Sequence, residues 1–283
     1  MKRSSLHDIT NIVLYVILFL LIQLVVTFAV AIIAMWIGGT PWPTISQHLH
    51  TGSLALNGKE LVAATAISSV LTFCLFVVCH WAPVKRDWLA TRPWTVLIWV
   101  VLLALGTILP SQWLVERMEI TLPESAEKLF ESIMGEPLGY VAIGILAPLV
   151  EELVFRGAIL RTLLKLFDRK WHWVAIVISA LIFGAVHMNI PQFVHAAFIG
   201  LLLGWMYYRT DSIIPGVAFH WVNNTVAFVM FHMLPQMNDG KLIDLFHGNH
   251  TTMMLSLLFS LCIFLPALFQ LSIRLKRAGK ERA

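Results

Sequence analysis

The sequence predicts an all-α polytopic membrane protein, on the strength of its composition, its long apolar runs and the distribution of its basic residues. Of the 283 residues, 58% are hydrophobic and only 13% are charged, whereas about a quarter of the residues in a soluble domain are charged. A bilayer core of about 30 Å needs roughly 20 apolar residues at helical rise. About eight such runs occur, at residues 12–37, 61–81, 94–114, 138–160, 173–188, 190–208, 213–234 and 253–273.

The first apolar run is long enough to be retained as a membrane anchor. It follows Met1-Lys2-Arg3 and continues from Ile12 to Ile37, whereas the apolar part of a cleavable signal peptide is only about 7–15 residues long. No polar stretch in the rest of the chain is long enough for a soluble domain. We therefore expect one integral membrane domain over residues 1–283, with a catalytic core at about 138–234.

The basic residues indicate the orientation of the spans. With eight spans and a cytoplasmic amino terminus, sixteen of the twenty basic residues fall in inner loops, and only four fall in outer loops: Lys59, Arg117, Lys128 and Lys241. Such an excess on one side is typical of cytoplasmic loops. We expect both termini to be cytoplasmic and the host membrane to be a bacterial inner membrane. The net charge of +4 gives no indication of a nucleic-acid partner.

Two connecting segments stand out. Residues 115–137 carry six of the sixteen acidic residues, and Ala126, Leu129, Phe130 and Ile133 recur at helical spacing, which predicts a short amphipathic surface helix with a solvated acidic face. Only Asn189-Ile190-Pro191-Gln192 separates the fifth and sixth runs, which predicts a tight turn.

Cysteines and isolated histidines are interpreted as packing residues. The three cysteines lie inside apolar runs and are odd in number, which favours core packing over a disulfide framework or a zinc ribbon. A lone histidine on an apolar helix is usually a satisfied core residue, and this interpretation is given to the histidines at three positions: His80, His195 and His232.

Charged residues inside the fourth span are the first candidates for chemistry. Ionisable groups cost about 2.5–3.5 kcal/mol each in hydrocarbon, so they indicate function by default. Glu151 and Glu152 are adjacent and therefore point about 100° apart on a helix. Glu152 and Arg156 are four residues apart and can pair along one face. Glu151 is then free to face another partner, where a carboxylate can serve as a general base.

Two more spans bring polar groups toward the bundle interior. The fifth ends in Phe183 to His187, and the seventh contains His220 and Asn224, which share a face. A glutamate, two histidines and an asparagine suit hydrolysis, because they can provide a base, a partner for water and donors for an oxyanion. At 1.5 Å per residue, however, His220 lies about 10 Å from the cytoplasmic end of its span and His187 about 20 Å from its own. Tilt or a longer fifth helix is needed to bring them level.

The three segments together resemble the CPBP intramembrane proteases (also called the Abi family), relatives of the type II CAAX prenyl endopeptidase. The family pattern is Glu-Glu-x-x-x-Arg, Phe-x-x-x-His and His-x-x-x-Asn on separate helices. Here the three motifs run from Glu151 to Arg156, from Phe183 to His187 and from His220 to Asn224. The resemblance covers about residues 147–224 and implies a helical fold with the active site inside the bundle.

The resemblance also implies roles for the motif residues. Glu151 and His187 would activate the attacking water, and His220 and Asn224 would stabilise the oxyanion. Glu152 and Arg156 would be a structural pair, with an ordinary interfacial ion pair as the alternative. Outside the motifs, Gly200 and Gly204 form a small-x-x-x-small face, which indicates helix packing.

Several functional alternatives remain open from the sequence. A metal-free mechanism is favoured, but Glu151, His187 and His220 could instead be three zinc ligands with water in the open position. A non-catalytic membrane immunity or binding protein is a second alternative. A transporter is disfavoured because spans one, two, three and eight offer almost no polar pathway. The expected partner is a membrane-associated protein or lipidated peptide substrate, whose identity the residues do not specify.

Overall fold

The computed structural model is all-α over the residues that it describes, which are 3–52, 56–85, 88, 94–119, 121–234 and 241–276. No strand occurs within these ranges, which confirms the predicted fold class. In chain order the helices are α1 (Arg3–Ile37), α2 (Trp42–Thr51), α3 (Gly58–Val78), α5 (Trp94–Arg117), α6 (Glu124–Met134), η1 (Tyr140–Leu146), α7 (Ala147–Glu152), η2 (Leu153–Leu160), α8 (Arg161–Leu166), η3 (Arg169–Trp171), α9 (His172–Ala185), α10 (Ile190–Thr210), α11 (Ile214–Met233), η5 (Asp244–Phe246) and α12 (His250–Arg274).

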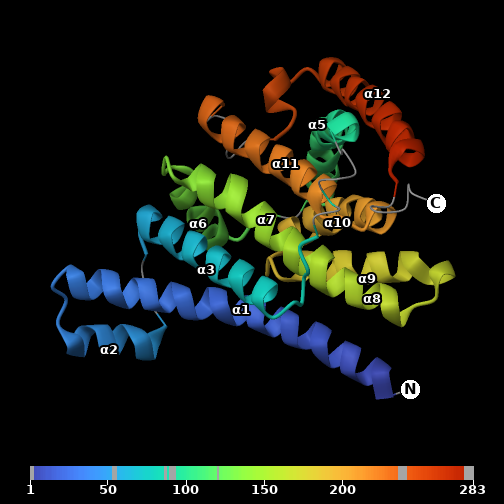
Figure 1. Cartoon of the computed structure of the whole chain (residues 1–283). Helices are drawn as coiled ribbons and strands as arrows, with labels where there is room; N and C mark the ends of the chain where they lie inside the picture. Colours follow the sequence, from blue (N-terminus) through green and yellow to red (C-terminus); the bar gives the residue numbers. More distant parts are fainter. Residues whose placement is uncertain are drawn as a thin grey trace.

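Five of the described helices are long and apolar enough to cross a membrane: α1, α3, α5, α10 and α12. The other three expected spans correspond to the helical stretch from η1 to α8, to α9 and to α11. The protein is therefore an integral membrane protein, and the count of eight spans stays a prediction. The start of α1 and the end of α12 lie toward the same end of the bundle, on the right in Figure 1. That this end is cytoplasmic also stays a prediction, and six of the inner basic residues lie outside the described residues: Lys2, Arg86, Arg92, Arg277, Lys280 and Arg282.

Asparagine side chains define the starts of three long helices. Asn57 accepts from the backbone N–H of Glu60, whose carboxylate accepts from the Asn57 N–H in return. Asn189 and Asn249 begin α10 and α12 in the same way, by accepting from the N–H three residues later. These caps satisfy backbone donors that no intrahelical carbonyl can reach. The Asn189 cap confirms the predicted turn between the fifth and sixth runs.

The helix from η1 to α8 crosses the centre of the molecule (Figure 1). α1 and α3 pack on one side of it, and α11 contacts α7 from another and leads on to α5 and α12. α9 and α10 form a close pair, because a side chain at Gly200 would lie only 3.1 Å from the Ala180 Cβ. Gly204 similarly faces Ile176. The small-residue face of α10 is thus a helix-packing surface, as predicted.

The surface helix was predicted correctly, whereas some packing residues were not. α6 confirms an amphipathic helix in the acidic segment. All three cysteines are free, as expected, but they are exposed on the outer faces of their helices rather than packed in the core. His80 and His232 are also exposed, so their assignment to the core was wrong. His80 follows the last turn of α3 with a positive φ of 57°, and the ring of His232 contacts the Phe228 carbonyl of its own helix.

Candidate active site

The helix that carries the two glutamates contains π-helical turns on both sides of α7. At the first junction the N–H of Ala147 donates to the carbonyl of Ala142, five residues earlier. In the same pattern the next residue, Pro148, would donate to Ile143, but proline has no N–H. Asn224 of α11 donates to the Ile143 oxygen instead, at 3.0 Å. The motif asparagine is thus held against the glutamate helix at a π-helical turn, an irregularity that is frequent at functional sites.

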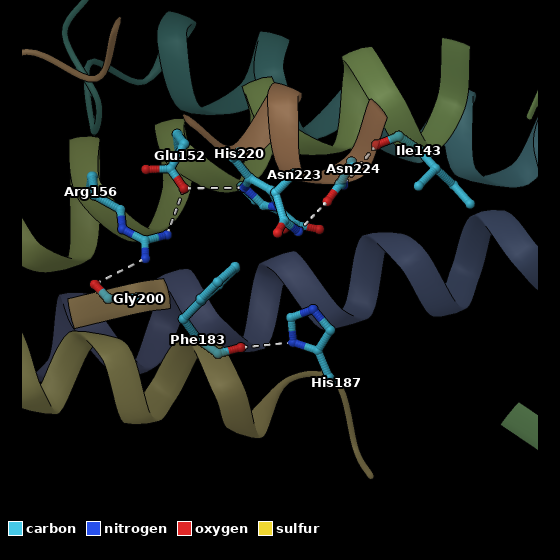
Figure 2. Close-up of polar contacts among 10 residues, drawn as sticks. Ile143, Glu152, Arg156, Phe183, His187, Gly200, His220, Asn223 and Asn224 are labelled. Atoms are coloured by element: carbon cyan, nitrogen blue, oxygen red, sulfur yellow. Dashed lines mark hydrogen bonds and ion pairs between the residues drawn. The ribbon is translucent and has the colours of Figure 1, made fainter. Parts of the chain in front are cut away.

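Glu152 and Arg156 form a fully buried ion pair. Arg156 Nη1 lies 2.8 Å from Glu152 Oε1, and the two side chains are 1% and 0% exposed. Arg156 Nη2 also donates to the Gly200 carbonyl, at 3.4 Å. The guanidinium carbon lies 4.4 Å from the centre of the Phe183 ring, within cation–π range. This burial excludes an interfacial ion pair and supports a structural role for the pair. Figure 2 shows the contacts of Arg156 with Glu152 and Gly200.

His220 lies between the two carboxylates. Its Nδ1 is 3.4 Å from Glu152 Oε1, and its Nε2 is 3.7 Å from Glu151 Oε2. The ring is 6% exposed and the Glu151 side chain is 19% exposed. Each ring nitrogen thus faces a carboxylate, and a proton on either one lets the ring donate to the glutamate on that side. The adjacent glutamates therefore occupy different environments, as the helix geometry predicted.

His187 lies just after the end of α9 and reaches the site through Phe183. Its Nδ1 is 2.9 Å from the Phe183 carbonyl, so its Nε2 is free for another partner. The Phe183 ring meets His187 edge-on at 5.3 Å and His220 at 5.8 Å. This shared contact brings the two histidines to one region, despite the difference in depth calculated from the sequence. Among the described residues, no hydrogen bond or ion pair joins His187 directly to Glu151, and Figure 2 shows the His187 ring across from Asn223 and Asn224.

Two further contacts hold α11 against η1. The indole N–H of Trp221 donates to the Tyr140 hydroxyl at 3.0 Å, and the same hydroxyl lies 3.1 Å from Thr225 Oγ1. Asn223 donates to the carboxamide oxygen of Asn224 at 3.4 Å. These bonds fix the face of α11 that carries His220 and Asn224.

His195 is not exposed, in line with its interpretation as a packing residue, and it also lies in the surroundings of the site. It lies in the second turn of α10, close enough to His187 and His220 for the charge of either ring to act on it. Its position directly after the His187–Asn189 turn could have indicated this, because a tight turn brings the first turns of α10 back alongside the end of α9.

A polar cavity of about 170 Å³ opens beside Glu151. Its lining comes from α1, α3 and α7: Phe19, Gln23, Thr27, Thr65, Ser68, Ser69, Ala147, Val150 and Glu151. These polar residues of the first two spans were not singled out from the sequence. The available clue was spacing, since two polar residues four positions apart occur in each of these spans.

The three alternative zinc ligands do not form a ready metal centre. Within the described ranges, no three His, Cys, Asp or Glu side chains come close enough together to hold a metal ion. In particular, His220 directs both ring nitrogens at carboxylates, and His187 directs Nδ1 at the Phe183 carbonyl. The observed donor arrangement therefore does not fit a tetrahedral zinc site.

Comparisons with known proteins match the same part of the chain. Residues 134–226 match the family model described as "Type II CAAX prenyl endopeptidase Rce1-like". The chain is also 27% identical over 107 residues to the Bacillus subtilis (strain 168) protein named "Putative membrane peptidase YdiL", a match that covers 38% of this chain and 43% of that protein. The matched region therefore spans less than half of this curated relative. No solved structure matches.

All six motif residues lie inside the matched segment: Glu151, Glu152, Arg156, His187, His220 and Asn224. The structure brings four of them into direct polar contact and connects the other two through Phe183 and Ile143. The matched segment is thus similar to the Rce1-like type II CAAX prenyl endopeptidases in its motif residues as well as in its sequence.

Proposed function

We propose that the protein is an intramembrane endopeptidase that hydrolyses a peptide bond in a membrane-associated substrate, with water activated by Glu151. The observation that carries this proposal is the position of Glu151 between His220 and the polar cavity. Its carboxylate is 3.7 Å from His220 Nε2 and it lines the cavity wall. A substrate in this cavity would lie against the Glu151 carboxylate, whose other neighbour is the His220 ring.

In this mechanism Glu151 takes a proton from water as the water oxygen adds to the carbonyl carbon of the substrate. The negative charge that develops on the carbonyl oxygen accepts a hydrogen bond from the His220 Nε2–H, while Nδ1 of the same ring lies beside Glu152. Glu151 then returns its proton to the departing amine, and the C–N bond breaks. Proton and charge balance without another reactant.

His187 and Asn224 have the free groups that their assigned roles require. With Nδ1 of His187 donating to the Phe183 carbonyl, Nε2 is an acceptor that can orient the attacking water. Asn224 uses one of its two N–H groups on the Ile143 carbonyl, so the second remains for the oxyanion. Both roles remain proposals that rest on these hydrogen bonds.

The test is cleavage of a quenched peptide panel, with and without a carboxyl-terminal prenyl group, by purified wild type and Glu151→Gln, each with and without a zinc chelator. We expect cleavage by wild type that survives the chelator and is lost in the variant. Glu124→Gln on α6, an exposed carboxylate remote from the motifs, is the matched control and should cleave normally. Loss of wild-type activity in chelator would replace this mechanism by the zinc alternative.

Failure of wild type to cleave any peptide would favour a non-catalytic membrane immunity or binding protein. The substrate class proposed here is a membrane-associated protein or a lipidated peptide, and the proposed location is a bacterial inner membrane. The match to a Bacillus subtilis protein supports the bacterial origin.

A further inference from the structure

The polar cavity beside Glu151 is formed by parts of the chain that lie outside the matched segment. α1 contributes Gln23 and Thr27, and α3 contributes Thr65, Ser68 and Ser69. The family match begins only at residue 134. The cavity therefore combines a reacting group of the common core with a wall that belongs to the amino-terminal half of this chain.

In the apolar stretches of α1 and α3, five polar side chains line the cavity: Gln23, Thr27, Thr65, Ser68 and Ser69. Gln23 and Thr27 are one turn apart, as are Thr65 and Ser69, so each pair shares a face. The side chains next to them point outward and are apolar, and they include Leu24, Val25, Ile67 and Val70. Polar groups inside a membrane are costly unless they face a partner or a water-filled space. The gathering of polar side chains at one cavity indicates that the cavity holds water or a polar part of a bound molecule.

The hydrogen-bonding state of the hydroxyls shows which kind of group fits. Thr27 donates to the Gln23 carbonyl at 2.7 Å, Thr65 to the Leu61 carbonyl at 2.9 Å and Ser68 to the Thr65 carbonyl at 3.0 Å. Their hydrogens are therefore used inside their own helices, and their oxygen lone pairs remain available to the cavity. These three hydroxyls present acceptors, which complement N–H donors, and the Gln23 carboxamide and the Ser69 hydroxyl can accept as well as donate.

An extended peptide supplies such donors, whereas a helical one does not. The backbone N–H groups of a helix are already bonded to carbonyls four residues earlier, so a protease must meet its substrate as an unwound segment. In a membrane the freed N–H groups need acceptors, because no lipid or bulk water supplies them. The cavity of about 170 Å³ has room for about six water molecules at roughly 30 Å³ each, or for a short stretch of main chain in their place.

We propose that this cavity is a substrate subsite in which α1 and α3 bind the main-chain N–H groups of an extended segment next to the scissile bond. The inference rests on the proposed function and extends it, because it assigns part of substrate binding to the amino-terminal half. The substrate class is then a peptide segment that is locally extended at the cleavage point, whether or not it carries a lipid.

The first test compares Thr65→Val with Thr107→Val in steady-state cleavage of the quenched peptides. Both threonines donate to the carbonyl four residues earlier, but Thr107 lies on α5, buried away from the cavity. We expect Thr65→Val to raise KM about three- to tenfold, the effect of one lost hydrogen bond, with kcat little changed. Thr107→Val should leave both constants unchanged. Equal KM values in the two variants would overturn the proposal.

The second test measures binding without cleavage. Ser69→Cys and Ile67→Cys are made in a background in which the three native cysteines are replaced by alanine, and each is treated with a water-soluble maleimide. Only the cysteine at position 69 should react, because it borders the polar cavity. Ile67 is 46% exposed on the outer face of the helix, where lipid would keep a water-soluble reagent away. Excess non-quenched peptide should slow this reaction severalfold.

These outcomes separate the subsite from the proposed function. Protection at position 69 without any cleavage by wild type would support the subsite and contradict the peptidase. Rapid labelling that the peptide does not slow would mean that the cavity is filled by water and does not bind the peptide, which would overturn the subsite. Absence of labelling at position 69 would overturn it as well.

Discussion

Adjacent glutamates with different surroundings should have separable functions. Glu151 borders a cavity and faces His220 across 3.7 Å, whereas Glu152 is completely buried against Arg156. We expect Glu151→Gln to lower kcat/KM by about 10²–10⁴-fold, the usual contribution of a general base, without changing thermal stability in detergent. The measurement is peptide cleavage beside a melting curve. A variant that unfolds as it loses activity would place Glu151 among the structural residues.

The buried pair should behave differently, because breaking it leaves a charge without compensation. Arg156→Ala exposes Glu152 to an apolar interior, and the expected loss of unfolding free energy is about 3–5 kcal/mol. Lys128→Ala is the matched control, since it breaks an ion pair of the same i,i+4 spacing on exposed α6, where the loss should be under about 0.5 kcal/mol. Denaturant titration of both variants gives the comparison. Similar losses in the two would mean that burial of the pair has no energetic effect.

At the scale of residues, the sequence was informative where spacing along one helix determines contact. The Glu152–Arg156 pair and the divergence of Glu151 both follow from 3.6 residues per turn. The position of His195 does not, because its proximity to His187 and His220 depends on how α10 folds back after the Asn189 turn. A single helical histidine has the same appearance in the sequence whether it faces the core or a reactive group.

At the scale of elements, the fit of α11 against the glutamate helix depends on the absence of a side chain at Gly216. A Cβ there would lie 2.5 Å from Glu152 Oε2, closer than non-bonded atoms approach. We expect Gly216→Ala to displace the carboxylate from Arg156 and His220 and to cost about 1–3 kcal/mol of stability through overpacking, with a parallel loss of cleavage. Melting and cleavage assays check this. Wild-type values in both would show that the helix can shift to make room.

The π-helical turns at the same contact could not be predicted from the sequence. Pro148 was visible inside the fourth span, but its effect depends on the i to i−5 hydrogen bonding of the π-helical turn. In that pattern the Ile143 carbonyl would accept from residue 148, and proline has no N–H to donate. Asn224 fills that position only because α11 packs there. The motif asparagine was found from its spacing to His220, whereas its bond to a backbone carbonyl emerged from tertiary packing.

At the scale of the whole molecule, the amino-terminal spans do more than anchor the core. Isolated Ser, Thr and Gln residues in apolar runs are common, so Gln23, Thr27 and Ser69 did not stand out individually. Only the packing of α1 on α3, and of α3 on α7, gathers them beside Glu151. Composition and run length were sufficient for the fold class, whereas the cavity required the arrangement of helices from both halves.

The orientation of the whole bundle can be tested with single cysteines in the connecting segments. The basic residues predict that the α8–α9 connection faces the cytoplasm and that α6 faces outward. In a background without native cysteines, Ser125→Cys should react with an impermeant maleimide in intact cells or spheroplasts, and Asp168→Cys only after permeabilisation. Ser125 is exposed on α6 and Asp168 lies between α8 and η3, so both positions are in connecting segments. The reverse pattern would mean that the bundle has the opposite orientation. Labelling of both cysteines from outside would mean that the chain crosses the membrane an even number of times between α6 and the α8–α9 connection, instead of once.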